Sequence, residues 1–139
     1  MVWGFGGLFF CALLPFEAMA ERLVAHVDLS EQRATISIDG EVIHSWPVST
    51  GKKKFETPPG YYNAQRKYVL WHSRTYDNAP MPYAVFFYGG YAVHGTNAVS
   101  RLGTAASHGC VRLATKNAKA FYDLVAEVGL AETLVEIVE

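Results

Sequence analysis

The stretch from Tyr91 to Leu113 reads YAVHGTNAVSRLGTAASHGCVRL. It places His94 before a Gly-Thr pair, then a polar loop, and then a run that ends Ser-His-Gly-Cys-Val-Arg-Leu. A thiol attacks a carbonyl group only as the thiolate, so a catalytic cysteine needs a nearby histidine or another source of positive potential. Glycine lets backbone N–H groups approach a developing oxyanion. The stretch therefore contains all the parts of a cysteine nucleophile site at Cys110, while the histidine that pairs with the thiol cannot be identified from spacing alone. The alternative, an inert buried cysteine, is typical of apolar surroundings, and the neighbours of Cys110 are polar.

Upstream of this stretch the sequence is typical of β-structure. Asp39-Gly40 is a tight hairpin signal, and Thr57-Pro58-Pro59-Gly60 is a turn that a central strand could not contain. Short runs with β-branched residues and partial alternation predict strands on both sides of these turns. The predicted strands are 23–29, 34–38 and 42–48, which form a meander, followed by 61–70 after the turn.

The rest of the chain predicts a loop, two strands, one helix and a last strand. The segment from Trp71 to Pro82 is rich in Asn, Asp, Pro and aromatic residues, so we expect a long loop that faces substrate. A helix is expected from Thr115, as its N-cap, to about Val128, with Gly129 as its stop. Its apolar stripe consists of Ala118, Phe121, Leu124, Val125 and Val128, and the further strands are 84–88, 91–94 and 133–138. The fold class predicted is mainly β with one or two helices.

Size and charge restrict the possible functions. The chain has 139 residues, half of them hydrophobic, which is room for one compact domain with a real core. The chain contains twelve Lys and Arg and thirteen Asp and Glu. This balance of charge argues against binding to nucleic acid or to an anionic membrane. The only charge run is Lys52 to Lys54. It is either a solvated loop or a guide for an anionic polymer.

The first twenty residues differ from all that follows. Residues 1–20 contain an apolar stretch and end in an Ala-x-Ala pattern at Ala18 and Ala20, which predicts a secretory signal peptide cleaved after Ala20. A buried N-terminal helix or a retained anchor is the alternative. Cleavage would remove Cys11 and leave Cys110 as the one cysteine of the domain at 21–139, in the periplasm. No histidine pair has the spacing or the acidic companion of a zinc site, so we expect neither a metal nor a cofactor.

The His-Gly-Thr and Ser-His-Gly-Cys-Val-Arg-Leu motifs resemble those of the L,D-transpeptidase catalytic domain, the YkuD family, in the form common among Gram-negative bacteria. The resemblance includes the Thr57-Pro58-x-Gly60 turn and covers 21–139. It implies a mixed β-sandwich. It also implies a cysteine that cleaves a peptidoglycan tetrapeptide stem between its third and fourth residues.

The resemblance also implies roles for individual residues. Cys110 matches the nucleophile and His94 the residue that takes up its proton, while the carbonyl of Gly95 would orient the imidazole. Backbone N–H groups of Gly109 and Cys110 would form the oxyanion hole. His108 would order the site and Ser107 would be structural, whereas Arg112 would contact a substrate carboxylate or form a structural ion pair. Further candidates for substrate binding are Thr96, Tyr76 and Tyr88, the last two from an aromatic cluster before the motif.

Three functions follow from this resemblance. The first is a transpeptidase that forms a thioester at diaminopimelate, releases D-Ala, and passes the acyl group to an amine of another stem or of an outer-membrane protein or lipoprotein. The second is a hydrolase, either an L,D-carboxypeptidase or an enzyme that releases an anchored protein. The third is a non-catalytic peptidoglycan-binding module. Carbapenem β-lactams are expected to acylate the cysteine.

Overall fold

The computed structural model describes Gly4, Gly7 and residues 22–139 of the chain. The predicted signal peptide at 1–20, including Cys11, lies outside the described residues except for the two glycines. Its cleavage stays a prediction. Within the described part, no helix is long and apolar enough to cross a membrane.

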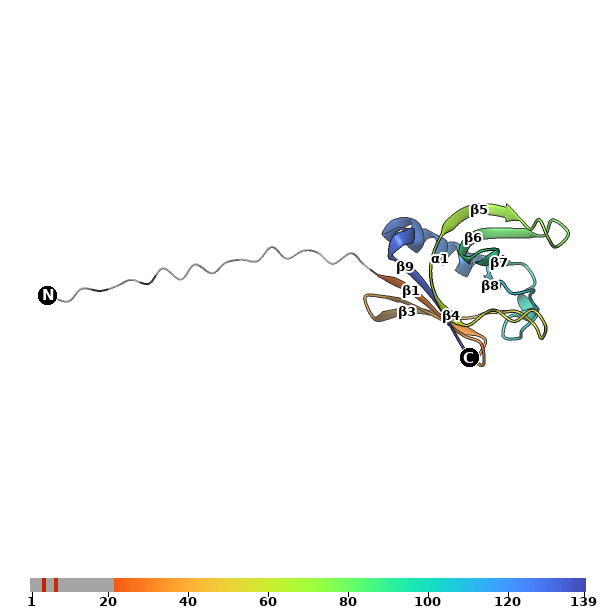
Figure 1. The fold of residues 1–139 in the computed structure, drawn as a ribbon, viewed down its shortest axis with the longest axis horizontal. Helices are drawn as coiled ribbons and strands as arrows, with labels where there is room; N and C mark the ends of the chain where they lie inside the picture. The colour runs from red at the N-terminus through yellow and green to blue at the C-terminus, as the bar shows by residue number, and fades with distance from the viewer. Residues whose placement is uncertain (1–3, 5–6, 8–21) are drawn as a thin grey trace.

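Five strands form the first sheet, in the order β3-β2-β1-β9-β4 (Figure 1). The first three are the predicted meander, and β9 inserts beside β1 in a parallel pairing. Pairing the last strand with the first ties the two ends of the domain together. The bounds are β1 Leu23–Asp28, β2 Arg33–Ile38, β3 Glu41–Pro47, β4 Gly60–Asn63 and β9 Thr133–Val138.

Four strands form the second sheet, in the order β5-β6-β7-β8. Its first three strands are antiparallel neighbours, whereas β8 runs parallel to β7. The strand β8 was not predicted from the sequence. The bounds are β5 Arg66–His72, β6 Pro80–Tyr88, β7 Tyr91–Thr96 and β8 Val111–Ala114.

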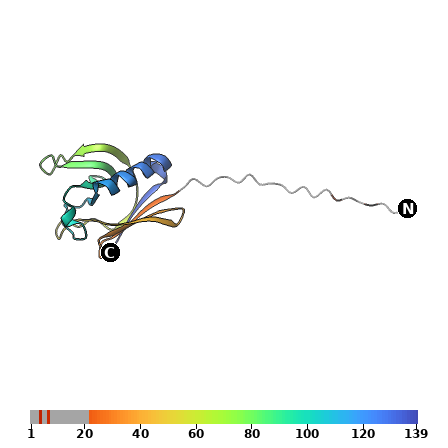
Figure 2. The ribbon, with the colours of Figure 1, turned by 180° about the vertical axis from the view of Figure 1, so that it is seen from behind.

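The one α-helix of the described residues, α1 (Thr115–Val128), lies between the two sheets, as Figure 2 shows from behind. Ala118, Phe121 and Val125 are its buried residues, and they follow the predicted stripe. Gly129 ends the helix with φ 95°, as expected. The prediction of Thr115 as the N-cap is wrong, because Ala114 holds that position and the Thr115 hydroxyl donates to the carbonyl of Thr96 at 3.3 Å. Two 3₁₀ turns, Val99–Arg101 and Leu130–Glu132, complete the described chain.

The two faces of the second sheet have different partners. Val85, Phe87, Val93, Val111 and Leu113 point inward and join the main core with α1 and the first sheet. Alternation along the strands then sends their neighbours to the outer face. There Ala84, Phe86 and Ala92 form a smaller cluster with Met81, against which Cys110 packs. The mixed two-sheet architecture expected from the sequence is confirmed, and the outer face is where the catalytic motif appears.

Two boundaries differ from the prediction. The segment 61–70 is not one strand, because the chain crosses between the sheets at Ala64 and Gln65. The Ala64 N–H donates to Thr133 in the first sheet, and the Gln65 N–H donates to Phe86 in the second. The predicted loop at 71–82 shortens to 73–79, since β5 and β6 extend into it from both sides.

Candidate active site

His94 and Cys110 come together because β7 and β8 are parallel neighbours. The register pairs Val93 with Val111 and His94 with Arg112. Side chains of paired residues share a face, so His94 and Arg112 both point to the outer side of the second sheet, and Cys110, two residues before Arg112, joins them. Fifteen residues of sequence lie between His94 and Cys110, yet the parallel pairing of β7 and β8 places Cys110, directly before β8, beside β7.

Both side chains line one cavity of about 770 Å³. Its lining includes Tyr76 of the loop between β5 and β6, Pro80 at the start of β6, and Asn97 and Thr115. Of the residues predicted for the site, the cavity is lined by His94, Gly95, Thr96, His108, Cys110, Arg112 and Tyr76.

His94 is held neutral by its surroundings. The ring is only 6% exposed, and its Nδ1 lies 2.7 Å from the carbonyl oxygen of Gly95, the contact that the family resemblance implied. Burial lowers the pKa of His94 to about 4, opposed by the Gly95 contact and assisted by the positive charge of Arg112. A carbonyl can only accept a hydrogen bond, so Nδ1 carries the proton and Nε2 keeps a free lone pair. At neutral pH the imidazole is therefore ready to accept a proton.

Cys110 rests as a protonated thiol. Burial raises its pKa, and the backbone of Ala92 and the charge of Arg112 offset part of that rise. Its Sγ donates to the carbonyl oxygen of Gly90 at 3.8 Å, and no hydrogen bond to His94 occurs among the described residues. The pair is thus a neutral thiol and a neutral imidazole in one cavity, so deprotonation of the thiol must accompany the approach of a substrate.

The turn before Cys110 is fixed by side chains from two loops. Buried Ser107 donates its hydroxyl to the carbonyl of Cys110 at 2.6 Å and accepts the N–H of Gly109 at 3.0 Å. Thr57, from the turn before β4, donates to the carbonyl of Gly109 at 2.7 Å. The N–H of Gly109 is therefore already engaged, contrary to its predicted place in the oxyanion hole. The N–H of Cys110 is the remaining candidate from that pair.

Gly109 cannot be replaced without strain. Its φ is +126°, and a Cβ at this position would lie 2.4 Å from Cε1 of Tyr91. Both the backbone conformation and the close ring require glycine here. The glycine of the Ser-His-Gly-Cys motif thus allows the turn that presents Cys110 to the cavity.

His108 is clamped between aromatic rings from two other loops. It stacks on Tyr76 with ring centroids 4.1 Å apart and an interplanar angle of 8°. Phe55 meets the same imidazole edge-on at 5.0 Å. This arrangement agrees with the expectation that His108 orders the site, and it joins the loop of Tyr76 to the nucleophile turn.

Arg112 is half-buried in the cavity wall beside both reactive groups. The ion pairs of the described residues are His26–Glu136 and Lys119–Asp123, so the structural ion pair considered for Arg112 does not occur there. A guanidinium without a carboxylate partner in a cavity is suited to an anionic ligand.

Tyr88 does not belong to the site. Its ring is half exposed and packs on Tyr62 and Tyr91, with centroids 5.1 Å and 5.9 Å away, outside the cavity. The prediction of Tyr88 depended on an aromatic cluster before the motif, and the register of β6 shifts between Phe86 and Tyr88, which the cluster does not reveal. Sequence reasoning also missed the contributions of Phe55 and Asn97, for which no local pattern gives a signal.

Metal ligation has no support in the described part of the chain, where no group of three or more His, Cys, Asp and Glu side chains gathers. The chemistry available in the cavity is that of a thiol, a neutral imidazole and a guanidinium. These groups suit acyl transfer through a covalent thioester.

Comparisons with known proteins give the same result as the geometry. L,D-transpeptidase 2 of Mycobacterium tuberculosis is 30% identical over 130 residues, which are 84% of this chain and 32% of that protein. The YkuD protein of Bacillus subtilis is 27% identical over 95 residues, 66% of this chain and 53% of its own. The chain thus spans a third to a half of the length of these relatives. The Gram-negative form of the family stays a prediction, since these relatives are from Mycobacterium and Bacillus.

Solved structures share the fold. An L,D-transpeptidase from Mycobacterium smegmatis superposes with a TM-score of 0.76 at 28% identity, covering 86% of this chain and 59% of that one. An L,D-transpeptidase in complex with imipenem superposes with a TM-score of 0.74 at 26% identity, covering 85% and 59%. The sequence model of YkuD, the L,D-transpeptidase catalytic domain, matches residues 22–137. This chain therefore belongs to the YkuD family of L,D-transpeptidase catalytic domains.

Proposed function

We propose that the chain is a peptidoglycan L,D-transpeptidase in which Cys110 forms a thioester with a tetrapeptide stem. The observation that carries this proposal is the joint placement of Cys110 and a neutral His94 in one cavity of a YkuD domain. Export to the periplasm through the segment 1–20 is part of the proposal, and the mass of the mature N-terminus tests it.

In the first half-reaction, Sγ of Cys110 attacks the carbonyl carbon of diaminopimelate at its bond to D-Ala, and the thiol proton passes to Nε2 of His94. In this proposal the N–H of Cys110 stabilises the oxyanion. Collapse of the tetrahedral intermediate breaks the C–N bond, and His94 returns the proton to the departing amine of D-Ala. The neutral state of His94 supports this order of steps, because only an unprotonated imidazole accepts the first proton.

In the second half-reaction, an amine attacks the thioester and gives its proton to His94, and the thiol re-forms. The amine comes from a second stem or from an outer-membrane protein or lipoprotein. Water in place of the amine would give carboxypeptidase or anchor-releasing activity on the same site. In this proposal Arg112 holds a substrate carboxylate during both steps, which its place in the cavity lining together with Thr96 supports.

The deciding experiment incubates the chain with purified disaccharide tetrapeptide and follows the products and the protein mass. Release of D-Ala together with an adduct on Cys110 is the expected result, and amine-exchanged or dimeric products distinguish the transpeptidase from the hydrolase. Cys110→Ala should abolish turnover and His94→Ala should slow acylation strongly. Full activity of Cys110→Ala would refute the assignment. Because a relative is solved in complex with imipenem, we also expect this carbapenem to acylate Cys110 and not Cys110→Ala.

A further inference from the structure

A second groove adjoins the cavity of Cys110 on the outer face of β5 and β6. It has a volume of about 380 Å³ and is lined by Arg66, Trp71, Arg74 and Phe86, while it shares Gly90 and Met81 with the main cavity. The carbonyl of Gly90 accepts the S–H of Cys110. A ligand in this groove therefore lies next to the sulfur atom that carries the acyl group.

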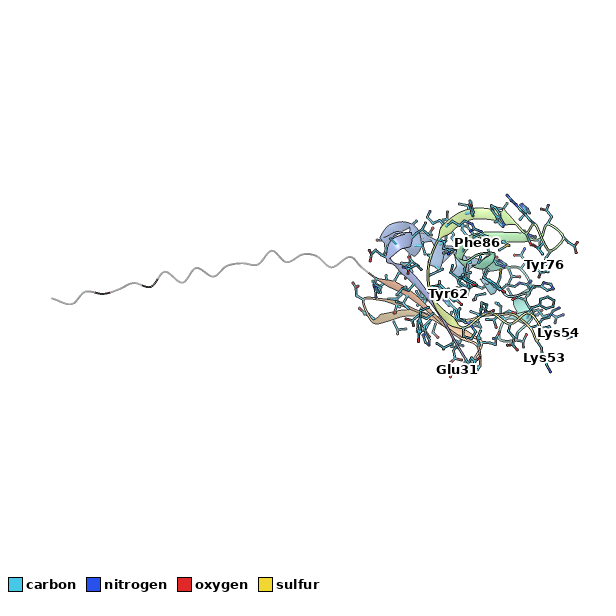
Figure 3. All side chains as sticks on the ribbon, viewed as in Figure 1. Glu31, Lys53, Lys54, Tyr62, Tyr76 and Phe86 are labelled. Atoms are coloured by element: carbon cyan, nitrogen blue, oxygen red, sulfur yellow. The ribbon has the colours of Figure 1, made fainter. Side chains whose placement is uncertain are left out.

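Two arginines are held in place at this groove by aromatic rings. The guanidinium carbon of Arg66 lies 4.1 Å from the ring centroid of Phe86, and its Nη2 donates to the carbonyl of Gly89 at 3.2 Å. The guanidinium of Arg74 lies 5.1 Å from the ring of Trp71. Stacking on a ring face leaves the N–H edge of a guanidinium available for a carboxylate. Figure 3 shows Phe86 on the upper sheet and Tyr76 toward the right-hand end of the molecule, and Ser73 and Thr75 of the loop that carries Tyr76 line both spaces.

Neither arginine forms an ion pair with the residues that the structure describes. The ion pairs of the described residues involve other side chains. Charge is also distributed unevenly, since residues 44–115, which carry both spaces, contain eight Lys or Arg and two Asp or Glu. Residues 22–43 and 116–139 together contain four Lys or Arg and nine Asp or Glu. The net charge of the chain is close to zero, but the segment 44–115, which contains the nucleophile, is positively charged.

We propose that the Arg66–Arg74 groove binds the free carboxylate of the amine acceptor, so that acceptors with an α-carboxylate are preferred to amines without one. The inference rests on the proposed function, because it assigns the second substrate of that reaction. The main cavity contains His94 and Arg112 and is the larger, which suits the donor stem. The groove is the adjoining space from which a second substrate reaches the same sulfur.

The test separates the two half-reactions in the full-length chain. Acylation is followed by protein mass with imipenem, and transfer is followed with the tetrapeptide donor and either glycine or glycinamide, which differ in the carboxylate. The double variant Arg66→Gln/Arg74→Gln should raise KM for glycine about tenfold or more, as expected for the loss of charge-assisted hydrogen bonds. Its KM for glycinamide and its acylation rate should change by less than about twofold. Arg101→Gln, an exposed arginine outside both spaces, is the matched control.

Equal effects on glycine and glycinamide, or slower acylation, would overturn the inference. If the chain forms no acyl-enzyme at all, the proposed function fails and the groove is tested by binding alone. Glycine is then titrated into Cys110→Ala while the fluorescence of Trp71 is followed. A saturable change that the double arginine variant lacks would support the groove, and its absence would reject it.

Discussion

The hydroxyl of Thr57 donates to the carbonyl oxygen of Gly109 at 2.7 Å and joins the turn before β4 to the residue that precedes the nucleophile. The same hydroxyl oxygen accepts the N–H of Gly51 at 3.0 Å. Thr57 is only 1% exposed, so neither contact is replaced by bulk water when the hydroxyl is removed. One buried side chain therefore fixes the connection between β3 and β4 and joins it to the nucleophile turn at the base of the active site.

Thr57→Val is expected to lower the free energy of unfolding by about 1–3 kcal/mol, because the substitution leaves a buried donor and a buried acceptor without partners. Turnover should fall more than the fraction folded, since the turn of Cys110 loses one of its supports. Chemical denaturation and steady-state kinetics measure the two effects. Thr57→Ser keeps the hydroxyl and should retain most of the stability and most of the turnover. An inactive Thr57→Ser would show that the methyl group matters instead.

Gly109→Ala tests the strain at the nucleophile turn. The added Cβ meets the ring of Tyr91, and φ is +126°, so we expect a loss of about 1–3 kcal/mol in the free energy of unfolding and a large loss of activity. Gly103 is the matched control, with φ +94° and no atom within 4 Å of an added Cβ. Gly103→Ala carries only the backbone strain. Equal losses in the two variants would show that the contact with Tyr91 is unimportant.

Sequence reasoning located the reactive pair and the supports within its motifs, such as Gly95, but not the supports that come from other loops. His94 and Cys110 could be predicted because each lies in a motif whose neighbouring residues also suit the chemistry of a cysteine nucleophile. The supports Thr57 and Phe55 lie in another loop, and nothing in their local sequence shows that tertiary packing brings them to Gly109 and His108. Tyr88 was misplaced for the same reason, because a register shift in β6 is invisible in an aromatic-rich strand.

The fold was predictable where strands pair with sequence neighbours. The meander and the final strand follow from alternation and turn signals, whereas β8 has four residues and pairs in parallel with a strand that ends fifteen residues earlier. Such a short segment inside a motif shows no period of its own. The break at Ala64 was missed because no Gly or Pro marks it, and the low strand propensity of Asn63 and Ala64 is too local to separate two strands.

The buried, neutral His94 makes stability depend on pH. Its pKa is about 4 in the folded chain and about 6.5 in an unfolded chain, so the unfolded state binds more protons between these values. The stability that neutral His94 contributes is fully present above pH 6.5. It is lost as the pH falls toward 4, by about 3 kcal/mol in total. Urea denaturation at pH 7, 5.5 and 4 measures this loss. In His94→Gln the contribution of this residue should disappear, and an unchanged slope would mean that other groups cause it.

Tyr76 and Tyr88 form a natural pair of test positions, because both rings are substantially exposed but only Tyr76 faces the cavity. Tyr76→Ala removes the stack on His108, which is worth about 1 kcal/mol, so kcat/KM should fall about fivefold. Tyr76→Phe keeps the ring and should stay near the parent activity. Tyr88→Ala should leave turnover within about twofold. A larger effect of Tyr88→Ala than of Tyr76→Ala on kcat/KM would contradict the placement of the two rings.

The lysine run at Lys52 to Lys54 is attached to the nucleophile turn through its backbone. Its positive charge therefore lies close to the active site. The N–H of Lys52 donates to the carbonyl of Ser107 at 3.0 Å, and its Nζ lies 5.6 Å from the ring of Phe55, which contacts His108. Figure 3 shows Lys53, Lys54 and Tyr76 at the same end of the molecule.

Three exposed ammonium groups at that end attract a polymer with many carboxylates more than a single stem, because their interactions with successive charges add along the strand. Replacing all three lysines by glutamine should therefore slow turnover of intact peptidoglycan about threefold to tenfold at low salt and leave turnover of the soluble disaccharide tetrapeptide unchanged. About 0.3 M salt should slow the parent chain on the polymer to a similar degree, since screening shortens the reach of these charges. Equal rates of the parent and the triple variant on the polymer at low salt would identify the run as a solvated loop, the other reading that the sequence allows.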